Sequence, residues 1–162
     1  MNRQYDRQMI TIRQIEEIEI PLSILLDADP SEECIDKYLP ESKSFGAFAD
    51  NSLVGVCVTN LNESGVWEIF NIAVIPERQK QGIGTELLNY VIAHFTDIGE
   101  MQLEIGTGTF GYQLLFYQRL GFRVKSIREN FFLDNYPDPV YDQGVQLKDM
   151  LRLRLELCRA GE

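Results

Sequence analysis

The spacing of hydrophobic residues along the chain changes between the period of a β-strand and that of an α-helix. Alternating apolar and polar residues, or a short continuous apolar run, predict a strand, whereas apolar residues three and four apart predict a helix. Strands are expected at residues 9–14, 45–49, 53–59, 66–75, 101–105, 122–127 (with a continuation toward 132) and 151–157. Helices are expected at residues 20–27, 31–39, 83–95 and 112–120.

The segments between these elements complete the predicted organisation. Residues 50–52 are polar and separate two strands, as in a hairpin. Residues 106–111 are expected to form a short loop and residues 134–146 a long one. A chain of 162 residues has the length of one domain with a substantial core. We therefore expect residues 1–162 to form a single domain of mixed α/β class.

The composition is that of an ordinary globular protein. Hydrophobic residues make up 44% of the chain and charged residues 25%. No apolar run approaches the roughly 20 residues of a membrane span, and the N-terminal segment lacks the apolar core of a secretory signal. Cys34, Cys57 and Cys158 are far apart, which favours reduced thiols over a disulfide or zinc site. A cytoplasmic protein without membrane contact is expected.

The charge and the histidine content narrow the classes of partner. A formal net charge of −10 disfavours nucleic acid, whose phosphates select basic surfaces. The same charge suits a cationic small substrate, although solubility alone is the simpler explanation. His94 is the single histidine, which disfavours most zinc sites and any triad that needs a second histidine. No metal is expected, and His94 is predicted to be exposed on the polar face of its helix.

The stretch IFNIAVIPERQKQGIGTELL, residues 69–88, is the most informative part of the sequence. An apolar strand leads into Pro76, then into a polar loop that contains Gly82 and Gly84, and then into an amphipathic helix. Glycine lets a backbone approach a ligand closely, and a helix that begins behind such a loop directs free N–H groups at an anion. A tight turn would also use these glycines, but the complete strand–loop–helix context favours a phosphate or pyrophosphate site. No Gly-Lys-Ser/Thr follows, so the loop is not a Walker loop.

A second glycine pattern lies later in the chain. Gly106, Gly108 and Gly111 spell G-x-G-x-x-G between a predicted strand and a predicted helix. A dinucleotide-binding fold places this pattern in its first strand–helix–strand unit, with an acid about 20 residues further on. The pattern here comes late, and the residues after it are expected to form antiparallel strands. An NAD-binding oxidoreductase is therefore the weaker alternative.

Three segments, in order, resemble the GCN5-related N-acetyltransferase (GNAT) superfamily. QKQGIG at residues 79–84 fits the motif Q/R-x-x-G-x-G/A, and it is flanked by EIFNIAVIPE before it and LFYQRLGF after it. Residues 135–157 are similar to those of a small group of uncharacterised bacterial members. The resemblance implies a central, mostly antiparallel sheet of six to seven strands with about four helices. It also implies that the strands ending near Ile75 and beginning near Met101 splay apart to admit acetyl-CoA.

The resemblance also implies an activity, the transfer of an acetyl group from acetyl-CoA to a primary amine without an acyl-enzyme. Backbone amides of the glycine loop would hold the pyrophosphate of coenzyme A, and the preceding strand would pair with its pantetheine arm. The N–H of Ile72 would polarise the thioester carbonyl. The residues implied in cofactor binding are Ile72, Ala73, Val74, Gln79, Lys80, Gln81, Gly82, Ile83, Gly84 and Thr85.

Two side chains match catalytic positions of the family. Glu68 matches the general base, which is needed because an alkylamine with a pKa of ~10 is protonated at neutral pH. Burial or a water relay would have to assist a glutamate in this role; the alternative is a solvated residue at the start of a strand. Tyr117 matches the acid that protonates the departing thiolate; the alternative is an aromatic side chain packed beside Phe116.

One position departs from the family pattern. Family members often carry an asparagine seven residues before the tyrosine, where this chain has Phe110. A hydroxyl of Thr107 or Thr109 would be a substitute for the lost contact. The departure leaves open a module that binds acyl-CoA without catalysing transfer.

The acceptor is not specified by the sequence. In the family, the early helical region covers the acceptor site. Four acids of this chain lie in that region: Asp27, Asp29, Glu32 and Glu33. They would either attract a cationic amine or cap helices and remain solvated. Small-molecule and peptide amines both remain candidates, and a homodimer is possible.

Overall fold

The computed structural model describes residues 8–158 and contains one seven-stranded sheet in the order β1-β2-β3-β4-β5-β9-β6. Neighbouring strands are antiparallel except β4 and β5, which are parallel. The strands of this sheet are β1 (Ile10–Ile15), β2 (Lys43–Ala49), β3 (Ser52–Leu61), β4 (Trp67–Val74), β5 (Gln102–Gly108), β6 (Arg123–Arg128) and β9 (Met150–Glu156). The predicted mixed α/β class and mostly antiparallel sheet are confirmed.

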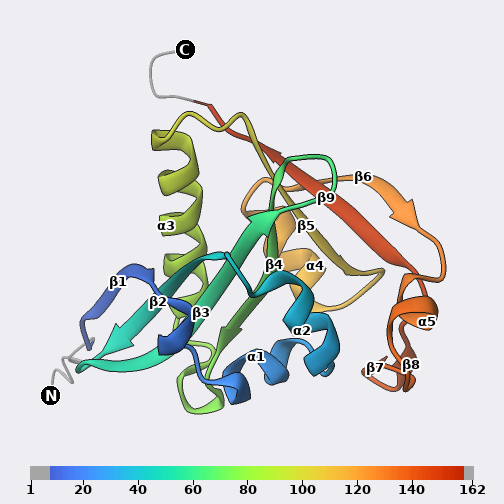
Figure 1. Cartoon of the computed structure of the whole chain (residues 1–162), viewed down its shortest axis with the longest axis horizontal. Helices are drawn as coiled ribbons and strands as arrows, with labels where there is room; N and C mark the ends of the chain where they lie inside the picture. The colour runs from blue at the N-terminus through green and yellow to red at the C-terminus, as the bar shows by residue number, and fades with distance from the viewer. Residues whose placement is uncertain (1–7, 159–162) are drawn as a thin grey trace, which may run out of the picture.

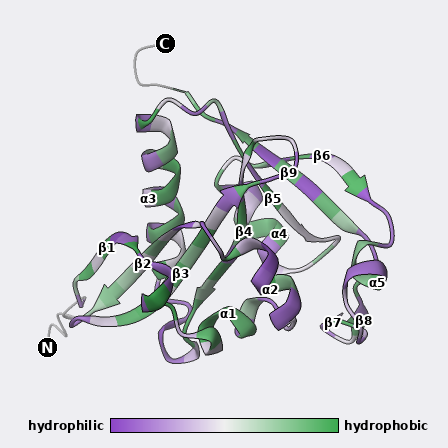
Figure 2. Ribbon diagram, viewed as in Figure 1, coloured by the Kyte–Doolittle hydropathy of each residue, from purple (hydrophilic) through white to green (hydrophobic). Residues whose placement is uncertain are grey.

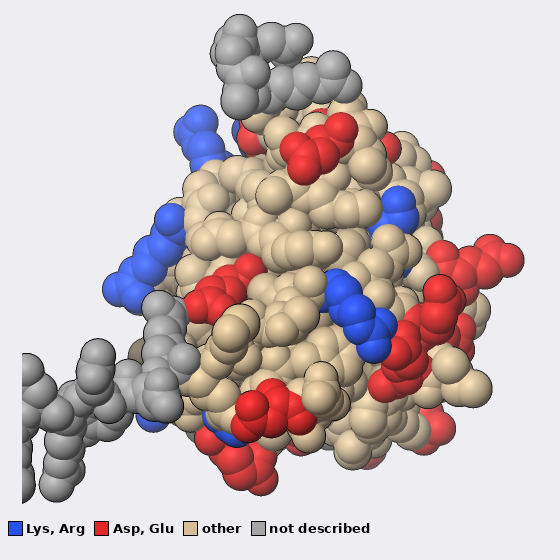
Figure 3. Space-filling model, turned by 90° about the vertical axis from the view of Figure 1, so that its left-hand side faces the viewer, with Lys and Arg blue, Asp and Glu red and all other residues tan. Residues whose placement is uncertain are grey.

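Helices cover both faces of the sheet (Figure 1). They are α1 (Leu22–Ala28), α2 (Glu32–Tyr38), α3 (Ile83–Asp97), α4 (Tyr112–Arg119) and the short α5 (Phe131–Asn135), with 3-10 turns η1 (Glu17–Glu19) and η2 (Pro76–Arg78). The apolar residues lie mainly in the sheet and in the helix faces turned to it, whereas α2 is largely hydrophilic (Figure 2). On the side shown in Figure 3, acidic and basic residues are scattered over a mostly uncharged surface.

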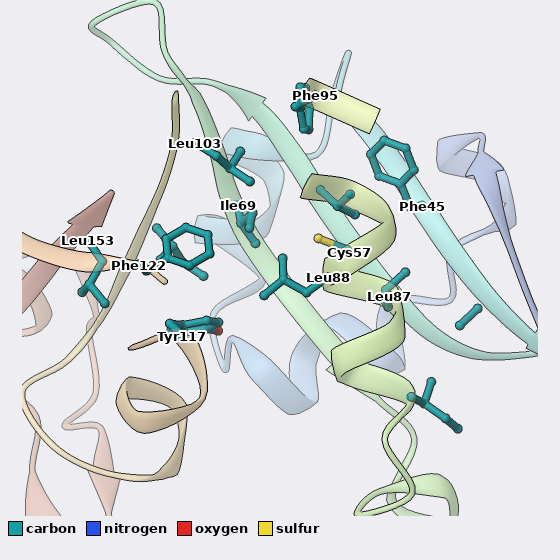
Figure 4. Close-up of a cluster of buried hydrophobic side chains, with 14 of the residues drawn as sticks. Phe45, Cys57, Ile69, Leu87, Leu88, Phe95, Leu103, Tyr117, Phe122 and Leu153 are labelled. Atoms are coloured by element: carbon teal, nitrogen blue, oxygen red, sulfur yellow. The ribbon is translucent and has the colours of Figure 1, made fainter. Parts of the chain in front are cut away.

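The alternation of side chains along the central strands separates two cores. Cys57 of β3 belongs to the larger core, which α3 and α4 cover (Figure 4). Val56 and Val58, its neighbours on the same strand, belong to a smaller core under α1 and α2. This arrangement follows from the period of two along a strand. Burial on both faces explains why the central strands read as continuous apolar runs.

The parallel contact between β4 and β5 is short. Only Glu68 with Glu104, and Ile69 with Ile105, are paired. A bulge at Phe70 interrupts the pairing of β4 with β3, because Thr59 lies opposite Ile69 while Val58 lies opposite Asn71. Beyond Ile69 the two parallel strands separate. The predicted splay of the central strands is therefore confirmed.

The predictions for residues 106–146 need correction. Gly106 and Gly108 lie in β5 rather than in a loop. The strand expected to continue toward residue 132 ends at Arg128, because Asn130 adopts a left-handed φ of 59° and α5 follows. The long loop contains the end of α5 and a small hairpin of β7 (Tyr141–Asp142) and β8 (Val145–Gln146). The chain thus has five α-helices among the described residues instead of about four.

His94 also differs from the prediction. Its ring is half-buried against Phe45, with the ring centroids 5.0 Å apart. Burial lowers the pKa of His94 below its usual value, and the nearby Lys43 lowers it further. The residue serves the packing of α3 on the sheet.

Candidate active site

The predicted glycine loop connects β4, through η2, to the N-terminus of α3. Gly82 is the N-cap of this helix, with φ 85° and ψ 5°, a left-handed conformation that favours glycine. No side chain caps the helix, and its first internal hydrogen bond runs from the Glu86 N–H to the Gly82 carbonyl (3.1 Å). The preceding N–H groups, those of Ile83, Gly84 and Thr85, are free of helix partners. With the dipole of a 15-residue helix behind them, these groups have the geometry that suits an anion.

Two glutamine side chains stabilise the loop internally. The Gln79 Nε2 donates to the Val74 carbonyl (3.0 Å), and the Gln81 Nε2 donates to the Glu77 carbonyl (3.3 Å). Between them Lys80 adopts a left-handed φ of 62°. The glutamines of the motif therefore hold the shape of the loop with their side chains. An anion bound here would contact backbone N–H groups.

Gly84 is not required by the packing of the protein. A Cβ added there would lie 3.8 Å from Phe116 and 3.9 Å from Val74, which is ordinary contact. A helix interior also favours alanine over glycine. The missing side chain at residue 84 therefore leaves room for a ligand above the helix N-terminus.

The backbone of β4 beyond the bulge has one paired edge and one open edge. The Ile75 N–H donates to the Val54 carbonyl of β3 (2.9 Å). Because backbone groups of successive residues point to opposite edges of a strand, Ala73 faces β3 as well. Ile72 and Val74 face the gap to β5. Of the three residues predicted to meet pantetheine, Ile72 and Val74 thus present backbone groups to the gap, whereas Ala73 does not.

Tyr117 lies on α4 and is 4% exposed. Its ring packs against Phe122, with the centroids 6.1 Å apart (Figure 4). Burial raises the pKa of the Tyr117 phenol above its usual value, and the nearby Cys57 adds to this. The hydroxyl therefore keeps its proton at neutral pH, and its role as a proton donor stays a prediction.

A cleft of about 370 Å³ opens on the side of the sheet that α2 covers. Glu68, Ile69 and Phe70 of β4 line it, so it begins where β4 and β5 part. Other residues that line the cleft include Asp29, Tyr38, Arg128, Phe131, Tyr136 and Arg152. The cleft joins parts of the chain that are remote in sequence.

Glu68 is buried in this cleft and ion-paired. The alternative that Glu68 is a solvated residue at the start of a strand is therefore wrong. Both of its oxygens accept from the Arg152 guanidinium, Oε1 at 2.5 Å and Oε2 at 2.9 Å. The Asn62 Nδ2 also donates to Oε1 (3.2 Å). Arg152 lies 3.5 Å from Glu104 as well. Although burial opposes the charged form of Arg152, its bonds to Glu68 raise the pKa of the guanidinium above its usual value.

The sequence did not single out Arg152. Alternation with leucines places it on the polar face of β9, but only the strand register brings it to Glu68. Its side chain crosses β5 at Gly106, where an added Cβ would lie 2.9 Å from the Arg152 Nη1 and 2.5 Å from the Met150 Sδ. The glycine that suggested a dinucleotide site thus makes room for an arginine.

The structure also separates the four acids near the first helices. Asp29 is buried and lines the cleft. Asp27, Glu32 and Glu33 are exposed. Thr107 is buried on β5, and Thr109 is exposed. That Thr107 or Thr109 replaces the family asparagine stays a prediction.

No cluster of three or more His, Cys, Asp or Glu side chains within residues 8–158 has the arrangement of a metal site. Within the same range, no helix combines the length and the apolar character that crossing a membrane requires.

Comparisons with known proteins agree with this geometry. The sequence profile described as the acetyltransferase (GNAT) family matches residues 11–122. The uncharacterised N-acetyltransferase YvbK of Bacillus subtilis is 39% identical over 135 residues, which are 83% of this chain and 87% of the relative. The solved IAA acetyltransferase from Bacillus cereus has a TM-score of 0.86 at 37% identity, covering 92% of this chain and all of the other.

A second solved relative was determined with its ligand. This GNAT family acetyltransferase from Elizabethkingia anophelis, with acetyl-CoA bound, has a TM-score of 0.85 at 42% identity. The match covers 91% of this chain and 98% of the other. The strand–loop–helix segment before α3, the splayed central strands and these matches lead to one conclusion: the chain belongs to the GNAT acetyltransferase family.

Proposed function

We propose that this protein transfers the acetyl group of acetyl-CoA to a primary amine, by direct attack within a complex that holds both substrates. The observation that carries the proposal is the junction at Phe70. On one side of this bulge Glu68 lines the cleft, and on the other side the open edge of β4 runs toward the Gly82 loop. A donor along β4 and an acceptor in the cleft would therefore meet at one point of the sheet.

The donor side suits coenzyme A. The free N–H groups at the start of α3 suit a pyrophosphate, and the space above Gly84 allows it to approach. The open edge of β4 offers Ile72 and Val74, although the side chain of Gln79 already occupies the Val74 carbonyl. Acetyl-CoA supplies an activated acetyl thioester, as expected from the relative named with it bound.

The acceptor side supplies a path for protons. The amine nitrogen forms a bond to the acetyl carbon as the bond from that carbon to sulfur breaks. The Ile72 N–H stabilises the charge that develops on the carbonyl oxygen. Glu68 takes up the proton that the amine loses, through a water molecule, on Oε2, which accepts from Arg152 alone and keeps a second acceptor site. Tyr117 donates its proton to the departing thiolate.

A binding measurement and a turnover measurement together test this proposal. Acetyl-CoA should raise the melting temperature of the protein, whereas NAD should not. Thiol release with a panel of primary amines should then exceed the release without an amine. Binding of acetyl-CoA with no thiol release on any amine would point to the acyl-CoA-binding module instead. An absence of binding to any coenzyme A ester would overturn the proposal.

A further inference from the structure

Asp29 is a carboxylate built into the wall of the cleft. The residue follows α1 and is 7% exposed. Its Oδ1 accepts from the Tyr136 hydroxyl (3.0 Å) and from the Ser31 N–H (3.2 Å). Its Oδ2 accepts from the Tyr38 hydroxyl (3.2 Å). All its donors are neutral, so the carboxylate is held in position while its negative charge is not compensated.

The other charged groups of the cleft do not compensate Asp29. Within residues 8–158 the ion pairs include none that involves Asp29. Arg152 is engaged by Glu68, and Lys37 lies 3.8 Å from Glu33. Arg128 and Glu63 also line the cleft, but both are exposed. A buried carboxylate without a cation is rare because its desolvation is costly. Within the described residues Asp29 therefore has no cation as an ion-pair partner. The cleft has room for a ligand that supplies one.

Aromatic rings surround this carboxylate. Tyr38 stacks on Phe70 with centroids 5.2 Å apart, and Tyr136 packs against Phe131 at 6.5 Å. All four rings line the cleft. Aromatic faces next to a carboxylate attract an organic ammonium group through both charge and the ring quadrupole. The net charge of −10 favours the approach of such a group.

We infer that Asp29 and its surrounding rings bind an ammonium group of the acceptor, which places the substrate in the class of diamines. The inference rests on the proposed acetyl transfer. An amine held at Asp29 as a cation has no lone pair for attack. The reacting nitrogen must therefore be a second, neutral amine that extends toward Phe70 and the thioester. One nitrogen gains the acetyl group and loses a proton, while the other remains a free ammonium in the product.

Three acceptors of equal chain length test this inference on the unaltered protein. Pentylamine, 1,5-diaminopentane and 5-aminopentanoate share one amine and end in a methyl, an ammonium and a carboxylate group. The diamine should exceed pentylamine in kcat/KM by roughly tenfold to a hundredfold, the range of a hydrogen bond to a charged group. The amino acid should be the poorest acceptor. A preference for 5-aminopentanoate, lost in Arg128→Ala, would overturn the inference and assign the cleft to amino acids.

A pair of variants localises the effect. Asp29→Asn should lower kcat/KM for the diamine to that of pentylamine and leave the KM for acetyl-CoA unchanged. Asp27→Asn removes the same charge at an exposed position two residues away and should change neither value. Equal losses on pentylamine and the diamine in Asp29→Asn would instead identify a structural role and contradict the inference.

A binding experiment separates this inference from the proposed reaction. Calorimetry should show that 1,5-diaminopentane binds the unaltered protein at least roughly tenfold more tightly than it binds Asp29→Asn. This result is expected even if no amine supports thiol release, an outcome that would contradict the proposed function alone. Equal affinities of the diamine for the two proteins would refute the ammonium subsite.

Discussion

At the scale of single residues, Glu68 carries the sharpest prediction. Glu68→Gln removes the proton acceptor and should lower kcat by roughly 10²- to 10⁴-fold, while the affinity for acetyl-CoA is unchanged. The amide also weakens the bond to Arg152, so activity should be compared well below the melting temperature of the variant. Steady-state kinetics together with acetyl-CoA titration measure both effects. An unchanged kcat would show that Glu68 is not the base.

Tyr117 is the second residue whose role is open to direct test. Tyr117→Phe keeps the ring in its pocket beside Phe122 and removes the proton donor. It should reduce kcat by roughly 10²-fold or more and alter the melting temperature at pH 7 little. If kcat at pH 7 persists in this variant, the thiolate leaves without help from Tyr117.

The raised pKa of Tyr117 adds a signature in the stability of the protein. The folded phenol keeps its proton above the unfolded pKa of ~10, so its contribution is complete below that pH and is lost as the pH rises further. The unaltered protein should therefore lose stability above pH ~10 more steeply than Tyr117→Phe. Tyr38 and Tyr136, whose pKa values burial also raises, remain in both proteins and provide the common background. Thermal melts over this pH range measure the difference.

At the scale of elements, the loop before α3 should bind the donor through backbone groups and helix dipole. Gly84→Asp places a negative charge in the first helical turn, which favours the helix by about 0.3–1 kcal/mol. The same charge repels a pyrophosphate. The variant should therefore keep its melting temperature or raise it, while its affinity for acetyl-CoA falls at least roughly tenfold.

A matched variant controls for the added charge. Gly144→Asp introduces the same residue at an exposed glycine that has no neighbouring atom within 4 Å of an added Cβ. It should leave acetyl-CoA binding unchanged. Equal losses in the two variants, or retained binding in Gly84→Asp, would show that the loop is not the phosphate site.

The sequence predicted most elements because their signals are local. The apolar spacing of α3 and the alternation of β9 can be read within single segments, and both elements were placed correctly. The errors at residues 106–146 have long-range causes. Gly106 continues a strand because it pairs with Arg152 of β9, whose side chain lies across it. The start of α5 involves Asp149, whose side chain accepts from the Asn130 N–H (2.8 Å).

One part of the candidate site could be predicted from a local sequence pattern, and the other part could not. The Gly82 loop could be predicted because one continuous segment builds it. The cleft could not, since it joins β4 to α2, α5 and β9. Asp29 and Tyr136 are 107 residues apart, yet they share a hydrogen bond, and no pattern in either segment indicates the other. The functional assignments of Glu68, Tyr117 and the loop residues stay predictions that the variants above test.

At the scale of the whole molecule, one group of charges holds the two halves of the sheet at the point where they part. Glu68 and Glu104 are neighbours across the β4–β5 pairing, and a buried and a half-buried carboxylate so placed would repel each other. Arg152, from β9, lies between them and bonds to both. The opening at which we propose that both substrates bind therefore depends on a side chain from a third strand.

Arg152→Met should show how much the fold relies on this charge. Its removal leaves the buried Glu68 without a cation, whereas Glu104 keeps Arg154 nearby. Breaking a buried pair in this way costs about 3–5 kcal/mol. In a chain of 162 residues this corresponds to a fall in melting temperature of roughly 6–20 °C. Arg154→Met is the matched control, because the Arg154 side chain is 35% exposed and lies 3.6 Å from Glu104; it should cost at most about 1 kcal/mol. Equal melting temperatures for the two variants would mean that the splay is held by strand pairing alone, since both changes remove one arginine from the same strand.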